Sequence, residues 1–326
     1  MKTVMRWMGR LVLLVLAAIA GFAALAPREP VVTEVSFDAD AIGEDLDAYL
    51  AAQEARFPDI TPGTEKRVLW AGEPGHQTDL AVLYVHGFSA TSEEIRPVPD
   101  RVAEALGANL VFTRLTGHGR SGAAMADTSL EAWMNDLAEA LAVARRAGRE
   151  VIVLSTSTGA TLATIGALDP TLQEGIKGQV FISPNFGINS PAAVILTWPG
   201  VRWWGPLVAG AERSFTPQND DHARYWSTRY PTVALMPMAA AVRHARALDV
   251  SAITQPLLAM FSDEDRVVSP DATRAVATLW GGEVRREIVR LGDGDDPYNH
   301  VIAGDILSPG QTDKTVTVIL DWIAGL

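Results

Sequence analysis

The sequence contains no cysteine, so disulfide bonds, thiolate catalysis and cysteine-ligated metal sites are excluded. Basic residues are also scarce, because 27 lysines and arginines stand against 39 acidic residues, for a formal charge of −12. Nucleic-acid phosphates require a basic face, so this balance argues against a nucleic-acid partner. Hydrophobic residues make up 48% of the 326 positions. This content is enough for one large α/β domain or two smaller ones, with disorder expected only at the ends.

A single long apolar run, residues 11–26, lies near the N-terminus. Lys2, Arg6 and Arg10 precede it and Pro27 follows it, which is the layout of an export signal. Cleavage after Ala26 would leave Pro27 as the first residue after the cut, and we expect its fixed ring to fit a cleavage site poorly. We therefore expect residues 1–26 to be an uncleaved anchor, with its charged end in the cytoplasm and the remaining chain in the cell envelope, facing the periplasm or exterior. A removed signal, which would export the protein, is the alternative.

The rest of the chain gives an electrostatic limit on membrane contact. Residues 27–326 hold 24 basic and 39 acidic side chains, and this negative charge is repelled by an anionic bilayer surface. Any membrane contact should therefore be made through the N-terminal segment or through apolar patches.

The most informative stretch is residues 151–159, Val-Ile-Val-Leu-Ser-Thr-Ser-Thr-Gly. Its branched apolar residues predict a strand buried on both faces, and a helical stretch follows the small residues. A strand, a sharp turn and a helix can hold a serine exposed as a nucleophile, here Ser157. The positions two before and two after it, Ser155 and Gly159, must be small because strand and helix backbones nearly touch there. The alternative is an ordinary serine- and threonine-rich helix N-cap.

Strands and helices alternate through much of the chain. We expect a surface helix within the extension 27–64, strands at 67–70, 81–85, 109–113, 151–154, 179–182, 256–261 and 283–291, and helices at 92–106, 130–147, 233–248 and 312–323. This order predicts a mostly parallel, doubly wound sheet with its active site beyond the carboxyl ends of the strands.

One strand leads directly into His86-Gly87-Phe88. Gly87 allows a sharp bend, so the amides of Phe88 and Thr158 can form a two-donor oxyanion hole. We expect His86 to order this loop by hydrogen bonding, and His118, between two glycines, to be structural as well.

His86-Gly87-Phe88, Gly117-His118-Gly119-Arg120-Ser121 and the Ser157 turn together resemble the α/β-hydrolase superfamily, in particular its monoacylglycerol-lipase and carboxylesterase-like serine hydrolases. The resemblance covers about residues 65–326, and Ser155 stands where the family usually has glycine. It implies an α/β-hydrolase fold, and a catalytic serine, acid and histidine in that chain order.

The resemblance also implies where the other catalytic residues and a cap lie. The acid would be Asp265, directly before the Val267-Val268 segment, with Asp263 as the alternative and Glu264 in a solvated loop. The histidine would be His300, the only one that follows the proposed acid. We interpret Asp293, Asp295 and Asp296 as a solvated loop, because EF-hand calcium spacing is absent.

An insertion at about residues 185–234 would form a helical cap over the active site. Its aromatic residues could line a slot for an apolar acyl chain or could form the small core of the cap itself. The candidates for the slot are Trp198, Trp203 and Trp204.

These observations predict a serine hydrolase that cleaves small carboxylic esters with an apolar acyl or alcohol part through an acyl-enzyme intermediate. No metal or organic cofactor is expected. A serine aminopeptidase or an acyltransferase would use the same scaffold and triad, and a non-catalytic envelope protein is the remaining alternative. The sequence does not define an oligomeric state.

Overall fold

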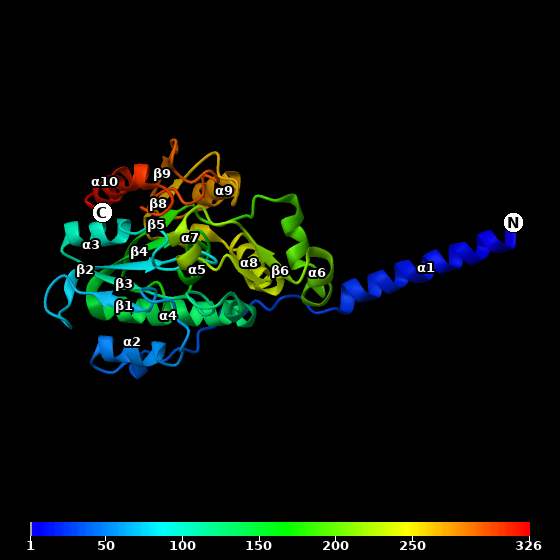
Figure 1. Cartoon of the computed structure of the whole chain (residues 1–326), viewed down its shortest axis with the longest axis horizontal. Coiled ribbons are helices and arrows are strands. Elements are labelled where there is room, and N and C mark those ends of the chain that lie inside the picture. The colour runs from blue at the N-terminus through cyan, green and yellow to red at the C-terminus, as the bar shows by residue number, and fades with distance from the viewer. Residues whose placement is uncertain (1) are drawn as a thin grey trace.

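A computed structural model describes residues 2–326 and is built around one seven-stranded sheet (Figure 1). The strands lie in the order β1 (Arg67–Leu69), β3 (Asn109–Phe112), β2 (Thr78–Val85), β4 (Gly148–Thr156), β5 (Ile176–Ile182), β8 (Leu257–Phe261) and β9 (Val284–Ile288). Within this sheet, the β1–β3 pair is antiparallel and the other described pairs are parallel. The predicted mostly parallel sheet is therefore confirmed.

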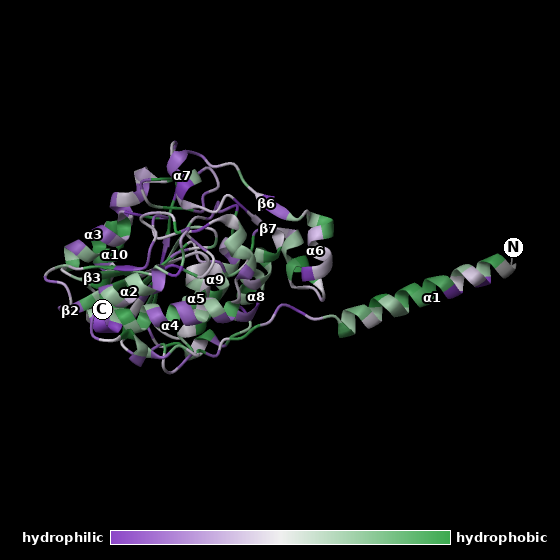
Figure 2. Ribbon diagram, turned by 60° about the horizontal axis from the view of Figure 1, so that its bottom comes forward, coloured by the Kyte–Doolittle hydropathy of each residue, from purple (hydrophilic) through white to green (hydrophobic). Residues whose placement is uncertain are grey.

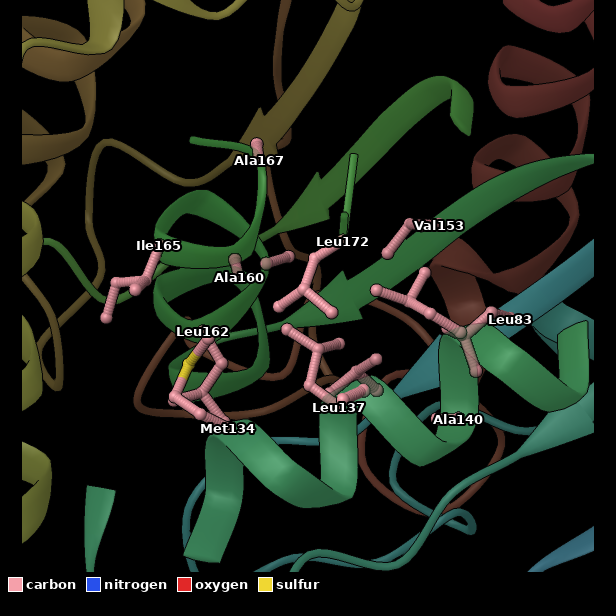
Figure 3. Close-up of a cluster of buried hydrophobic side chains, with 14 of the residues drawn as sticks. Leu83, Met134, Leu137, Ala140, Val153, Ala160, Leu162, Ile165, Ala167 and Leu172 are labelled. Carbon is pink, nitrogen blue, oxygen red and sulfur yellow. The ribbon is translucent and has the colours of Figure 1, made fainter. Parts of the chain in front are cut away.

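Helices cover both faces of the sheet, because successive strand residues point to opposite sides. On one face, Leu83 and Val153 pack with helices α4 (Leu130–Ala147) and α5 (Thr158–Gly166), as Figure 3 shows. Helices α8 (Leu235–Ala245) and α9 (Pro270–Leu279) add buried residues to the same core. On the other face, α3 (Val98–Leu106) and α10 (Thr312–Ile323) contact each other and cover Val82 and Ile152.

Two predicted helices differ from the structure. The helix expected over 92–106 begins only at Val98, since Pro97 caps it, Pro99 is its second residue, and the chain before them forms turns. The helix expected within 37–57 is a 3₁₀ turn, η1 (Ala39–Ile42), followed by α2 (Leu46–Glu54). Gly43, with φ of 69°, separates the two, and the Asp45 carboxylate caps α2 by accepting from the Ala48 N–H at 2.9 Å.

The segment between β5 and α8 leaves the sheet and forms small elements of its own. They are η3 (Pro191–Thr197), α6 (Val201–Ala209), β6 (Glu212–Ser214), α7 (Asp220–Tyr225), β7 (Arg229–Pro231) and η4 (Thr232–Ala234). Strands β6 and β7 pair antiparallel. We call this segment the cap.

Helix α1 (Lys2–Leu25) projects away from the rest of the molecule at the end occupied by α6 (Figure 1). Its Val4–Leu25 portion is long and apolar enough to cross a membrane, a test that a signal sequence also passes. None of its most apolar stretch is buried in the protein. Figure 2 shows that hydrophobic residues occupy most of the helix.

Candidate active site

Ser157 lies at the sharp turn between β4 and α5. Its φ of 52° and ψ of −115° form a strained conformation for a residue with a side chain. A Cβ on Gly159 would lie 2.3 Å from the carbonyl oxygen of Val85, so no side chain fits there. Ser155 is fully buried in β4, and its hydroxyl has no hydrogen-bond partner within residues 2–326. The turn therefore accommodates serine at the position where the resembling family usually has glycine.

The structure brings Ser157, His300 and Asp265 together, although they lie far apart in the sequence. His300 Nε2 lies 3.1 Å from Ser157 Oγ, and His300 Nδ1 lies 2.8 Å from Asp265 Oδ2. All three residues are buried. Burial lowers the pKa of His300, but the charge and hydrogen bond of Asp265 outweigh burial and hold it above its usual value.

The two candidate acids have different surroundings. Asp265, in the loop after β8, accepts hydrogen bonds through Oδ1 from the N–H groups of Val267 at 2.7 Å and Val268 at 2.9 Å. These bonds leave Oδ2 aimed at the imidazole. Asp263 is exposed and pairs with Arg274 instead of the histidine. The geometry thus distinguishes two carboxylates that the sequence leaves as alternatives.

Asp296 corrects the prediction that the 293–296 carboxylates form a solvated loop. It is buried, and its Oδ2 accepts from the N–H groups of His300 at 3.1 Å and Val301 at 3.0 Å. Its Oδ1 accepts from the Tyr298 N–H and from Gln218 Nε2 in the cap. Only Asp293 is fully exposed as expected. Asp296 therefore fixes the loop that carries the imidazole and connects it to the cap.

The proposed oxyanion-hole residues, Phe88 and Thr158, both line one cavity with Ser157. Neither amide donates a hydrogen bond to another group within residues 2–326. Thr158 opens α5, where the first amides of a helix have no intrahelical acceptor. A Cβ on Gly87 would lie 3.1 Å from Ser157 Cβ, so the Gly87–Phe88 backbone passes directly beside the serine.

Two buried side chains hold the Gly87 peptide groups in place. Glu94 Oε2 accepts from the Gly87 N–H at 2.7 Å and from the Tyr84 hydroxyl at 3.0 Å. His86 Nε2 accepts from the Leu115 N–H at 3.1 Å, so Nδ1 carries the proton and donates to the Gly87 carbonyl at 2.9 Å. Burial lowers the pKa of His86 well below its usual value and raises that of Glu94 to about 7.

His118 packs beside His86, with ring centroids 5.1 Å apart. Burial lowers its pKa to about 4, and its Nδ1 lies 3.2 Å from the Thr116 carbonyl oxygen. Neither histidine contacts Ser157, in keeping with the loop-ordering role expected of them.

A cavity of about 390 Å³ adjoins Ser157 and His300 beneath the cap. Apolar and aromatic side chains form most of its wall: Phe88, Phe215, Trp226, Tyr230, Leu235 and Met238. The three tryptophans that the sequence offers as candidates for an acyl slot are not among its residues. Trp198 and Trp203 are exposed, and Trp204 donates from Nε1 to the Pro199 carbonyl at 2.9 Å. The slot alternative is therefore wrong for these three residues, which lie on or next to α6 at the end of the body nearest α1 (Figure 1).

No group of three or more histidine, aspartate or glutamate side chains within residues 2–326 could hold a metal ion.

Residues 76–288, more than half of the chain, match the family described as serine aminopeptidase, S33. The chain belongs to this family. It is also 28% identical over 228 residues to a thermostable monoacylglycerol lipase from Bacillus sp. (strain H-257), a match that covers 69% of this chain and 86% of the relative.

Solved structures confirm that this S33 family member has the α/β-hydrolase fold. A structure described under LipS and LipT, two metagenome-derived lipolytic enzymes, matches with a TM-score of 0.66 and 20% identity, covering 82% of this chain and all of that one. A soluble variant of the monoglyceride lipase of Saccharomyces cerevisiae matches with a TM-score of 0.58 and 12% identity, covering 79% of this chain and 90% of that one. At these identities the likeness concerns the fold alone.

Sequence patterns do not indicate two further functional residues of this S33 family chain. Glu94 and Asp296 have no distinctive spacing, because each acts through tertiary hydrogen bonds to backbone amides. The only local signal for Asp296 is its position four residues before His300, where a carboxylate can accept from the N–H groups that follow it.

Proposed function

We propose that the protein is a serine hydrolase of carboxylic esters in which Ser157, His300 and Asp265 form the catalytic triad. The observation that carries this proposal is the unbroken hydrogen-bond chain from Asp265 through His300 to Ser157 beside an apolar cavity. The matched relatives are described as lipases or lipolytic enzymes, which supports ester substrates.

The geometry gives each residue a role. Ser157 Oγ attacks the ester carbonyl carbon while His300 Nε2 takes its proton, and Asp265 stabilises the imidazolium through Nδ1. The Phe88 and Thr158 amides donate to the oxyanion of the tetrahedral intermediate. His300 then protonates the departing alcohol. A water molecule, deprotonated by the same imidazole, releases the acyl group as a carboxylate and regenerates the serine.

Glu94 and His86 support this chemistry as positioning residues. They hold the N–H and the carbonyl of Gly87 from two sides, which fixes the following peptide group and hence the direction of the Phe88 amide. An oxyanion hole gains its effect from donors fixed before the charge develops.

The cavity favours an ester with an apolar part over a peptide with a free amino terminus. An aminopeptidase needs a free negative charge for the substrate ammonium group. Among the carboxyl groups that line the cavity, Glu94 has its pKa raised to about 7 by burial, and Asp296 already accepts four hydrogen bonds. Aminopeptidase or acyltransferase activity is therefore the second candidate, on the same triad.

A matched pair of assays tests the proposal. The wild type should react with a fluorophosphonate probe and hydrolyse p-nitrophenyl esters, whereas Ser157→Ala should do neither. Amino-acid p-nitroanilides should be poor substrates. A labelled Ser157→Ala variant would overturn the nucleophile assignment, and faster cleavage of the anilides than of any ester would make the protein an aminopeptidase.

We also propose that residues 1–26 anchor the protein to a membrane, leaving residues 27–64 as an extension and 65–326 as the hydrolase domain with its cap at about 185–234. The length of Val4–Leu25 supports this arrangement. It rises about 33 Å at 1.5 Å per residue, close to the ~30 Å hydrocarbon thickness. Full-length protein should stay in carbonate-washed membranes, and a mature N-terminus near residue 27 would show instead that the segment is a removed signal.

A further inference from the structure

The outer end of the cap exposes a cluster of large apolar side chains, which we call the cap tip. Val194 belongs to η3, and Trp198 directly follows η3. The other members, Trp203, Leu207 and Val208, belong to α6. Trp203 and Leu207 are four residues apart and so share one side of α6, where they are 62% and 85% exposed. Large apolar side chains exposed together on neighbouring elements indicate a docking surface, whereas single exposed apolar residues do not.

The cap tip lies at the base of α1, and the two are joined by specific contacts. The Phe22 and Trp203 rings meet edge to face at 6.4 Å, and the Gly200 N–H donates to the Pro27 carbonyl at 2.6 Å. Gly200 has φ of 65°, and a Cβ there would lie 2.5 Å from the Phe22 ring. The chain therefore passes from α1 to the cap in close contact with η3 and α6.

An ion pair completes this joint. Arg202 donates through Nε and Nη2 to the two carboxylate oxygens of Glu29, at 2.6 and 2.7 Å, and the Glu29 side chain is almost fully buried. Arg28 donates to the Thr197 carbonyl at 3.0 Å. A bidentate arginine–carboxylate pair fixes relative orientation as well as distance. The joint therefore holds the cap in one orientation relative to the axis of α1, whereas a flexible linker would leave the cap free to turn.

The position of the cap tip follows from the length of α1. If Val4–Leu25 spans the hydrocarbon, the surface of that bilayer on the side of the hydrolase domain lies near Leu25, only a few residues from the joint. Figure 1 shows α6 at the end of the body nearest α1, and Figure 2 shows hydrophobic residues on both helices. Tryptophan is enriched at this level of a bilayer because its ring is amphipathic. The remaining chain is too acidic for attraction to anionic lipid, so contact there must be apolar.

We propose that the cap tip docks on the outer surface of the same bilayer that α1 crosses, with Trp203, Leu207 and Val208 in the interfacial layer. The inference rests on the membrane anchor proposed above. The joint and the cap tip together hold the hydrolase with its cap against the lipid. The kind of ester that this arrangement serves is one that partitions into the membrane.

The absence of cysteine makes a direct test possible, since one introduced thiol can be labelled alone. Leu207→Cys and a control, Leu279→Cys, carry an environment-sensitive fluorophore in full-length protein reconstituted into phosphatidylcholine vesicles. Leu279, on α9 outside the cap, is also highly exposed, at 64%. Lipid spin-labelled near the headgroup should quench the label at 207 roughly threefold more strongly than the label at 279, with a blue-shifted emission.

The possible outcomes distinguish a failure of the docking from a failure of the anchor. Protein that is retained in carbonate-washed vesicles but quenched equally at both positions overturns the docking and leaves the anchor intact. A label at 207 that is shielded from water but not quenched by lipid means that a second copy or another protein covers the patch. Loss of the protein from washed vesicles overturns the anchor and the docking together.

A second pair of variants tests the joint. Arg202→Gln, which breaks the pair with Glu29, should reduce the quenching at 207 about twofold, because the cap is then free to reorient. The control Arg285→Gln breaks an exposed pair with Asp321 and should leave the quenching unchanged, because these residues belong to β9 and α10, which lie away from α6 in Figure 1. Equal quenching in the wild type and Arg202→Gln would mean that the joint does not orient the cap.

Discussion

The two walls of the catalytic cavity are built in different ways. On the side of the sheet, Ser157, Asp265 and His300 follow strands β4, β8 and β9 and are held by hydrogen bonds to the backbone. On the cap side, Phe215 directly follows the three-residue strand β6, Tyr230 lies within the three-residue strand β7, and Phe215 is 37% exposed. The catalytic residues are thus positioned by strands that belong to the main core. The wall that contacts the acyl or alcohol part is formed by short elements, in which substitutions should cost less stability.

The largest effect should separate two aspartates of one loop on the sheet side. Asp265→Asn should lower kcat about 10³- to 10⁴-fold, because an amide in this position favours the imidazole tautomer that cannot accept the Ser157 proton. Asp263→Asn should stay within about twofold of the wild type, since Asp263 pairs with Arg274 on the surface. Steady-state hydrolysis of a p-nitrophenyl ester measures both, and the reverse ranking would transfer the acid role to Asp263.

The same loop determines the acid limb of the activity profile. Because the pKa of His300 is raised, kcat/KM should fall as the pH drops through a value above the usual histidine range, where the base becomes protonated. In Asp265→Asn this limb should move to lower pH, because the charge that favours the imidazolium is gone. An unchanged limb would mean that another group titrates.

Glu94 gives the next effect, on stability. Its pKa is about 7 in the folded protein against an ordinary value of 4.5. Below pH 4.5 both states bind this proton, and between 4.5 and 7 only the folded state retains it. Stability from this group is therefore lost as the pH rises through this window, by about 3 kcal/mol. Glu94→Gln should lack that loss in urea unfolding at pH 5 and pH 8, whereas the exposed control Glu104→Gln should retain it.

Asp296→Asn should cost about 2 kcal/mol, because the two Asp296 oxygens each accept two hydrogen bonds and the NH2 group that replaces one of them cannot accept, so two of the four donors lose their partner. The exposed Asp293→Asn should change the unfolding free energy by less than about 0.5 kcal/mol. The comparison predicts that Asp296→Asn also lowers kcat, since the loop carrying His300 loosens. Equal unfolding midpoints for the two variants would mean that Asp296 belongs to a solvated loop, as the sequence predicts.

A substitution on the cap tip should affect only the hydrolysis of esters held in the membrane. Leu207→Asp should slow hydrolysis of an ester embedded in the vesicle that holds the enzyme by several-fold, because a carboxylate is unfavourable in the interfacial layer. Hydrolysis of soluble p-nitrophenyl acetate should be unchanged, since Leu207 does not line the cavity. Equal loss on both substrates would indicate damage to the cap instead.

Sequence patterns predict the sheet side much better than the cap. Helices α4 and α10 have the predicted bounds, because a single apolar stripe determines where each begins and ends. The strained turn at Ser157, with φ of 52°, can be predicted from the sequence because its strand, turn and helix are consecutive along the chain. The face that a tryptophan of the cap presents depends on tertiary packing, so the sequence could offer Trp198 and Trp203 only as candidates for the cavity wall, and both lie outside it. Asp296 was missed for the same reason.

The smallest effect concerns Ser155, the departure from the usual glycine. Its buried hydroxyl has no partner, so Ser155→Ala should stabilise the protein by up to about 1 kcal/mol and leave kcat unchanged. Thr161→Val is the matched opposite, because the Thr161 hydroxyl donates to the Asn185 carbonyl at 2.6 Å and its loss should cost about 1 kcal/mol. Thermal unfolding of both variants measures the difference. A destabilised Ser155→Ala would mean that the hydroxyl is needed, whereas the predicted gain means that the strand before the nucleophile requires only a small residue.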